Sequence, residues 1–286
     1  MKSKALSKML GIMLALVMAM AVSACGQAPS DGSPSGTPAA EPVELMVFAA
    51  ASLTETLTEI AEMYKATNSN VTIMFNFDSS GTLQTQIEEG AVCDLFISAA
   101  QKQMDALDAS KSGGENPKGQ DFVEPGTRVN LLESKVALAV PEGNPKGIMS
   151  FADLAGKLKA GDVLMALGNS DVPVGQYTQK ILAYFGLDET ELAKAGCITY
   201  GSNVKEVTTQ VYEASVDCGV VYATDAFSAG LEVVDTATKE MCGQVIYPAA
   251  VMKNSRNREA AQAFLDYLKT DECMAVFERV GFSPAE

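Results

Sequence analysis

Residues 45–55 read LMVFAAASLTE, an apolar run that passes through three alanines into a segment with helical spacing. The apolar residues 45–49 predict a buried strand, and apolar side chains then recur on one helix face as far as Tyr64. Ser52 followed by Glu55 has the spacing of a capping box, so we expect a helix to begin there. A strand that leads directly into a helix is the repeating unit of α/β proteins.

The same unit recurs along the rest of the chain. Apolar runs bounded by turn residues predict further strands over 71–77, 94–98, 135–140, 163–167, 198–200, 219–222 and 245–251. Helical spacing predicts helices over 83–89, 104–107, 150–154, 173–185, 204–213, 257–269 and 271–279. Glycines and prolines over 111–124 predict a surface loop near a junction of two lobes. This alternation favours an α/β fold with mostly parallel sheets flanked by helices.

The N-terminal segment has the features of an export signal followed by a linker. Three lysines within the first eight residues precede an uncharged apolar run over 9–22, and Val22-Ser23-Ala24-Cys25 is similar to a bacterial lipobox. We therefore expect a signal peptide over 1–24 and a lipid on Cys25 that anchors the protein to the outer face of the bacterial cytoplasmic membrane. Secretion without lipidation is the alternative. Residues 25–42 are rich in Gly, Ser and Pro and predict a flexible tether.

The composition excludes several functional classes. With 36 Asp and Glu against 21 Lys and Arg, the chain would repel a nucleic-acid backbone. It contains no His, which excludes Ser-His-Asp and Cys-His catalysis as well as imidazole metal ligands. Five cysteines follow Cys25, namely Cys93, Cys197, Cys218, Cys242 and Cys273. Their odd number and the lack of a C-x-x-C pair favour buried free thiols, with one or two disulfide bridges as the alternative.

Four of the predicted strands run into helix starts through small or hydroxyl residues. These junctions lie at 47–55, 77–83, 168–175 and 200–206, and the last pairs Asn203 with Glu206 as a second capping box. Each helix start leaves backbone N–H groups unpaired and carries the positive end of the helix dipole. If the four starts converge, they form an anion site without Lys or Arg; ordinary helix capping is the alternative.

Seven stretches, taken in order, resemble the molybdate-binding proteins of ABC transporters over nearly the whole chain after the linker. They are VFAAASL at 47–53, SSGTLQTQI at 79–87, DLFISA at 94–99, VPVGQY at 172–177, GVVYATDA at 219–226, Tyr247-Pro248 and Gly281-Phe282. The resemblance implies a two-lobed type II periplasmic-binding-protein fold with two crossover strands. It divides the chain into a first lobe over 43–134 and 245–286 and a second lobe over 135–244.

The resemblance also implies where a ligand binds. Molybdate or tungstate would accept hydrogen bonds from the hydroxyls and amides of Ser52 and Ser80, the backbone N–H groups of Val174 and Val204, and the Tyr222 hydroxyl. Such a protein is a monomer that delivers its ligand to a membrane permease and its ATPase, with no cofactor, no directly bound metal cation and no catalytic residue. Sulfate or phosphate binding is the first alternative, and an extracellular serine hydrolase is a remote one.

Asp78 departs from the family pattern, because a carboxylate near the cleft would repel a dianion. A carboxylate there could instead accept the proton of hydrogen phosphate. We expect Asp78 to point away from the cleft and to cap the helix that contains Leu83.

Overall fold

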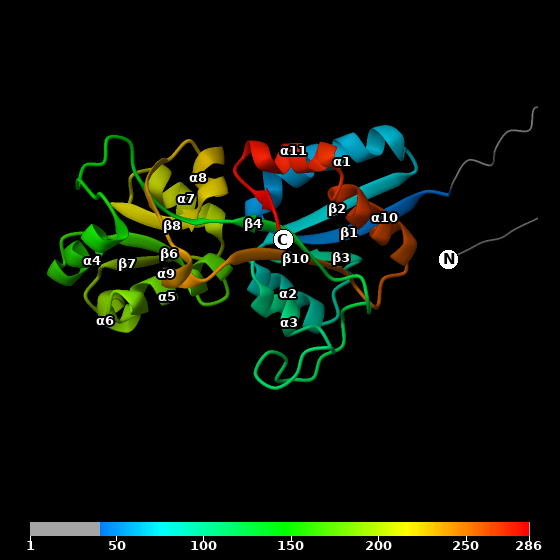
Figure 1. Ribbon diagram of the computed structural model, residues 1–286, viewed down its shortest axis with the longest axis horizontal. Helices are drawn as coiled ribbons and strands as arrows, with labels where there is room; N and C mark the ends of the chain where they lie inside the picture. Colours follow the sequence, from blue (N-terminus) through cyan, green and yellow to red (C-terminus); the bar gives the residue numbers. More distant parts are fainter. Residues whose placement is uncertain (1–40, 286) are drawn as a thin grey trace, which may run out of the picture. The chain divides into compact units, whose positions relative to one another are not determined.

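A computed structural model describes residues 41–285 of the protein. The predicted signal peptide over 1–24, the lipidation site Cys25 and nearly all of the tether over 25–42 lie outside the described residues. Within the described part, the helices and strands form two sheets with helices packed against them (Figure 1). We call each sheet with its helices a lobe.

The first lobe is built on a six-stranded sheet. Its strand order is β11 (Ser283–Pro284), β4 (Val129–Ser134), β10 (Val245–Val251), β3 (Leu95–Ile97), β1 (Val43–Ala50) and β2 (Val71–Asp78). Its helices are η1 (Ala51–Leu53, a 3-10 turn), α1 (Thr54–Thr67), α2 (Ser80–Glu88), α3 (Gln101–Asp105), α10 (Arg258–Leu268) and α11 (Asp271–Arg279). Figure 1 shows α1 and α11 on one side of this sheet and α2 and α3 on the other.

The second lobe is built on a five-stranded sheet. Its strand order is β7 (Ile198–Gly201), β6 (Met165–Gly168), β8 (Cys218–Tyr222), β5 (Val136–Val140) and β9 (Glu232–Thr236). Its helices are α4 (Phe151–Ala160), α5 (Pro173–Tyr184), α6 (Glu189–Lys194), α7 (Val204–Tyr212), α8 (Ala223–Ser228) and α9 (Lys239–Cys242). The α/β class and the two-lobed architecture expected from the sequence are confirmed.

The expectation of mostly parallel sheets is wrong, because both sheets are mixed. Strand β1 pairs in parallel with β2 and β3, and β6 pairs in parallel with β7 and β8. The pairings made by β4, β5, β9, β10 and β11 are antiparallel. The chain leaves the first lobe along β4, enters the second along β5 and returns along β10. Neighbouring strands that cross in opposite directions must pair antiparallel.

Burial on both faces explains the continuous apolar runs of the central strands. Leu45, Val47, Ala137 and Leu138 are fully buried, and one apolar cluster extends through both sheets. Each large side chain buried in this way contributes about 1.5–3 kcal/mol. The five cysteines among the described residues are buried free thiols, which settles the pairing that the sequence left open. None of the helices in residues 41–285 combines the length and the apolar character that a membrane crossing requires.

The loop at 111–124 packs against the first lobe. Val123 forms a β-bridge with Met252, and the Phe122 N–H donates to the Leu107 carbonyl at 2.8 Å. The Glu124 N–H donates to the carbonyl of Val251, in the strand β10, at 2.9 Å. The predicted loop is therefore confirmed, and the contacts that hold it are made within one lobe.

Candidate functional site

The four strand-to-helix junctions meet at one cavity. The cavity is tight, with about 10 Å³ of free space, and its walls come from both lobes. It is lined by Ala50, Ala51 and Ser52 from the first junction, Asp78, Ser79 and Ser80 from the second, Val172 and Pro173 from the third, Val204 from the fourth, and Ala99 and Tyr222. The convergence that spacing alone left open is thus present.

Four of the five predicted ligand residues line this cavity, namely Ser52, Ser80, Val204 and Tyr222. Val174 does not line it; its side chain is fully buried, directly after the lining residue Pro173. Sequence reasoning did not single out Ala99 or Val172, whose apolar side chains carry no chemical signal. Their contribution follows only from the way the strand ends are brought together.

Backbone donors are available at these helix starts. Among residues 41–285, no hydrogen bond occupies the backbone N–H of Ser80, Val174 or Val204. These residues stand in the first turns of α2, α5 and α7, where no carbonyl of the helix itself can accept from them. The predicted cap at Asn203 is confirmed, since its side chain accepts from the Glu206 N–H at 3.1 Å. The Glu206 carboxylate, however, accepts from the Ser202 N–H at 2.7 Å instead of completing a capping box.

The Ser80 hydroxyl accepts one hydrogen bond from the protein and can still donate its own proton. The side chain is fully buried, and its Oγ accepts a hydrogen bond from the backbone N–H of Ala99 at 2.9 Å. Because Ala99 is the donor in that bond, the Ser80 hydroxyl keeps its own proton for another acceptor. A buried hydroxyl in this position is a ready donor to a ligand in the cavity.

Ser52 is held by a residue that lies far away in the sequence. Its Oγ lies 3.0 Å from the hydroxyl of Tyr247, on the strand β10, and either group can donate. Burial raises the pKa of Tyr247 well above its ordinary value, so the phenol stays protonated. The capping box predicted for Ser52 and Glu55 is wrong, because the 3-10 turn η1 intervenes and Leu53 precedes α1 without a side-chain cap.

Tyr222 reaches from the second lobe to the first. Its hydroxyl donates to the carbonyl of Ala99 at 3.4 Å, a long and therefore weak bond. Its ring stands edge-on to Tyr177 and Tyr247, with centroid distances of 6.5 and 5.6 Å. Burial raises the pKa of Tyr222 well above its ordinary value, so its hydroxyl also remains a neutral donor.

The predicted helix cap by Asp78 is wrong. Ser79, not Asp78, caps α2, because the Ser79 Oγ accepts from the Thr82 N–H at 3.1 Å. Asp78 is half-buried and lines the cavity, and its Oδ1 accepts from the Ser79 N–H at 2.7 Å. The serine is the better cap here because it directly precedes the first helical residue. Asp78 is therefore one of the residues that line the cavity.

The two lobes touch each other on either side of the cavity. The Gly81 N–H of α2 donates to the Asp171 carbonyl at 3.0 Å, and a Cβ on Gly81 would lie only 2.3 Å from that oxygen. Lys205 of α7 contacts the Glu55 carboxylate of α1 at 2.8 Å and Asp225 at 3.1 Å. Burial alone would lower the pKa of Lys205, but the two carboxylates raise it. At the Gly81 contact the two backbones lie so close together that only a glycine fits at position 81.

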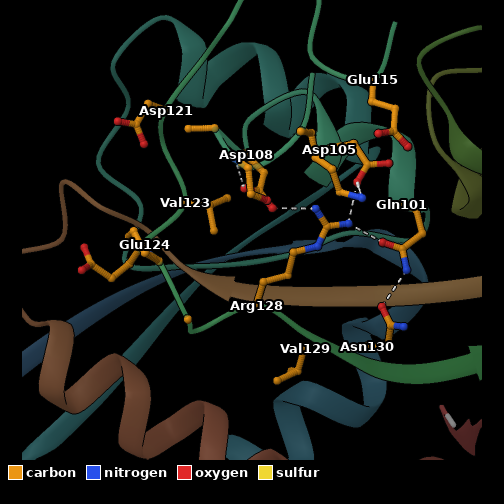
Figure 2. A pocket seen from close by; sticks show the side chains of 15 residues that line it. Gln101, Asp105, Asp108, Glu115, Asp121, Val123, Glu124, Arg128, Val129 and Asn130 are labelled. Carbon is orange, nitrogen blue, oxygen red and sulfur yellow. Dashed lines mark hydrogen bonds and ion pairs between the residues drawn. The ribbon is translucent and has the colours of Figure 1, made fainter. Parts of the chain in front are cut away.

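A larger hollow lies elsewhere in the first lobe and holds a structural ion cluster. It encloses about 670 Å³, and five of the fifteen residues that line it are acidic (Figure 2). At its centre, Arg128 contacts Asp105 at 2.6 Å and Asp108 at 2.8 Å, so its charge is already satisfied. No group of three or more Cys, Asp or Glu side chains that could hold a metal ion occurs in the described part of the chain.

Known proteins with the same architecture place the chain in a family. The family model of bacterial extracellular solute-binding proteins matches residues 45–283. YvgL of Bacillus subtilis, named by inference as an ABC transporter substrate-binding lipoprotein, is 36% identical over 84% of this chain and 86% of its own. The molybdate-binding protein ModA of Escherichia coli is 33% identical over 84% of this chain and 89% of its own.

A solved structure agrees with this assignment at the level of the fold. The periplasmic molybdate-binding protein of Azotobacter vinelandii superposes with a TM-score of 0.70 at 21% sequence identity, covering 85% of this chain and all of that one. The family match extends over nearly all described residues, and both relatives are aligned over most of their length. The chain therefore belongs to the bacterial extracellular solute-binding proteins, as a ModA-like member.

Proposed function

We propose that this protein is the substrate-binding component of an ABC importer and that it captures molybdate, and also tungstate, between its lobes. The observation that carries the proposal is the meeting of four strand-to-helix junctions at one cavity. In this proposal the anion accepts hydrogen bonds from the hydroxyls of Ser52, Ser80 and Tyr222 and from the amides of Val174 and Val204. The identity with a molybdate-binding relative supports the choice of anion.

The chemistry of these donors favours an anion without a proton. No Lys, Arg or His lines the cavity, so the charge of the ligand is met by hydroxyls, amides and helix dipoles. Each hydrogen bond to a charged group contributes about 1.5–3 kcal/mol to binding. A proton on the ligand would face another donor and leave both buried and unpaired.

The same proposal includes the setting in which the protein works. It acts as a monomer without a resident cofactor, is held at the membrane by a lipid on Cys25, and passes its anion to a permease that is driven by an ATPase. The relationship to YvgL, whose name includes the term lipoprotein, supports the anchor. The absence of His from the sequence supports a binding protein over a hydrolase.

A second candidate ligand is hydrogen phosphate, and Asp78 is the observation that favours it. A carboxylate in the wall can accept the proton of hydrogen phosphate, whereas it repels an unprotonated dianion. The substitution Asp78→Asn separates the two candidates by the sign of its effect. It should strengthen the binding of molybdate by removing repulsion, and it should weaken the binding of hydrogen phosphate by removing the acceptor.

The direct test is isothermal titration calorimetry of the purified protein with molybdate, tungstate, sulfate and phosphate at neutral pH. We expect tight binding of molybdate and tungstate, and weaker binding of the smaller sulfate ion. Phosphate should bind roughly 10–100-fold more weakly than molybdate, because an unpaired buried donor costs about 1–3 kcal/mol. Preferential binding of phosphate, or the absence of binding by all four anions, would refute the proposal. Elemental analysis of the purified protein for molybdenum and tungsten provides an independent check.

A further inference from the structure

We infer that the oxyanion enters the site through one particular groove, in which the ammonium groups of Lys102 and Lys180 attract it and accelerate its capture. The inference rests on the proposed function, because it assumes that the ligand is an anion. Beyond the proposed function, it identifies the route by which the anion enters. It also identifies two residues outside the binding cavity that determine the association rate.

The groove lies between the lobes and adjoins the cavity. It encloses about 570 Å³ and is lined by residues of the first lobe that include Lys102, by residues of α5 that include Lys180, and by residues 242–244 just before β10. Pro173 lines both the groove and the cavity, and Ala100 directly follows the cavity residue Ala99. An ion in the groove is therefore next to the site.

The groove carries positive charge that nothing in its walls cancels. Its lining includes two lysines and no carboxylate. Within residues 41–285, neither Lys102 nor Lys180 takes part in a salt bridge. The Nζ of Lys180 lies 3.5 Å from the Cys242 carbonyl and 5.2 Å from the centre of the Tyr177 ring, which orient the ammonium group without neutralising it.

The surroundings of Lys205 and of Asp78, which also adjoin the cavity, are acidic. Lys205 lies next to the cavity residue Val204, but Glu55 and Asp225 both contact it, so that cluster has an excess of negative charge. The hollow beside this cluster is also lined by Glu213. On the side of the Gly81 contact, Asp78 lines the cavity itself. An anion is repelled on these sides.

Steering matters for this protein because its formal net charge is −15. At long range such a molecule repels a dianion, so productive encounters depend on local positive charge near the site. At about 0.1 M salt, charges act over only about 10 Å, so only lysines that border the entrance can contribute. The free lysines of the groove meet this condition, whereas a lysine on a remote helix does not.

The test compares the association rates of two double variants. One variant combines Lys102→Gln with Lys180→Gln, and the control combines Lys65→Gln with Lys159→Gln. The control removes the same charge from one exposed helix in each lobe, away from the groove. Stopped-flow mixing with molybdate can follow tyrosine emission, since the chain has eight Tyr and no Trp.

At low ionic strength the groove variant should associate about 3–10-fold more slowly than the wild type, while its dissociation rate stays within about twofold. The difference should vanish at about 1 M salt, where charges are screened within about 3 Å. The control variant should match the wild type throughout. Equal slowing in both variants, an unchanged rate in the groove variant, or a deficit that persists at high salt would overturn the inference. If the wild type binds no oxyanion at all, the proposed function itself fails instead.

Discussion

The two lobes build their halves of the cavity in different ways. The first lobe presents three serines; Ser79 caps α2, while the hydroxyls of Ser80 and Ser52 are held by Ala99 and Tyr247. The second lobe presents Val172, Pro173 and Val204, whose side chains carry no polar atom. Apart from the Tyr222 hydroxyl, its donors are backbone N–H groups at helix starts.

This difference determines which substitutions should affect binding. In the first lobe a donor is lost when the serine side chain is shortened. In the second lobe the donor is retained by every residue except proline, which lacks the N–H. Four substitutions test this contrast, and their expected effects on molybdate binding decrease from Ser80→Ala to Tyr247→Phe. All four expectations rest on the proposed function.

Ser80→Ala should have the largest effect, because it acts on binding and on stability. Loss of a hydrogen bond to a charged ligand should weaken molybdate binding by about 1.5–3 kcal/mol. The buried Ala99 N–H also loses its acceptor, which should lower the free energy of unfolding by about 1–3 kcal/mol. Calorimetry and denaturant unfolding measure the two effects. Ser255→Ala, a buried serine bonded to Asp94 outside the cavity, should lose stability but keep its affinity.

Val204→Pro should weaken molybdate binding by about 1.5–3 kcal/mol with little change in stability. Proline fits the first helical position, and Asn203 before it already has the extended conformation that proline favours. The control Val204→Ala keeps the N–H and should bind within about 0.5 kcal/mol of the wild type. If Val204→Ala loses as much affinity as Val204→Pro, the valine side chain and not its amide is the important group.

Gly81→Ala should prevent the lobes from approaching as closely as they do. Its Cβ would lie 2.3 Å from the Asp171 carbonyl oxygen, and relieving such a clash costs about 1–3 kcal/mol. We expect weaker molybdate binding through faster dissociation, and a larger radius of gyration in X-ray scattering with ligand present. Gly156→Ala, in a helix with open space around the new methyl group, should leave both quantities unchanged.

Tyr247→Phe should have the smallest effect of the four. The substitution removes only the hydroxyl that holds Ser52 and should weaken molybdate binding by about 0.5–1.5 kcal/mol. Because the Ser52 Oγ is then free to accept a proton, the preference for molybdate over phosphate should also narrow in calorimetry. Tyr267→Phe serves as the control, and a comparable loss there would indicate a general effect on stability.

Local patterns were sufficient to predict most of the structure. The strands and helices around the four junctions lie where apolar spacing places them, and Asn203 caps α7 as its position predicts. The strands β4, β9 and β11, the turn η1 and the helices α6, α8 and α9 were missed, because short elements give too few residues for a period to be recognised. The mixed pairing of the sheets was also missed, since strand direction depends on where the chain crosses between lobes.

The sequence by itself determined that strands run into helix starts. It also determined that small residues, hydroxyl groups and backbone amides stand at these positions. The tertiary structure alone decided where those groups point. The partner of Ser52 is 195 residues away, Ser79 and not Asp78 caps α2, and Pro173 lines the cavity whereas Val174 does not. Backbone conformation follows from neighbours in sequence, whereas the direction of a hydroxyl or a carboxylate follows from neighbours in space.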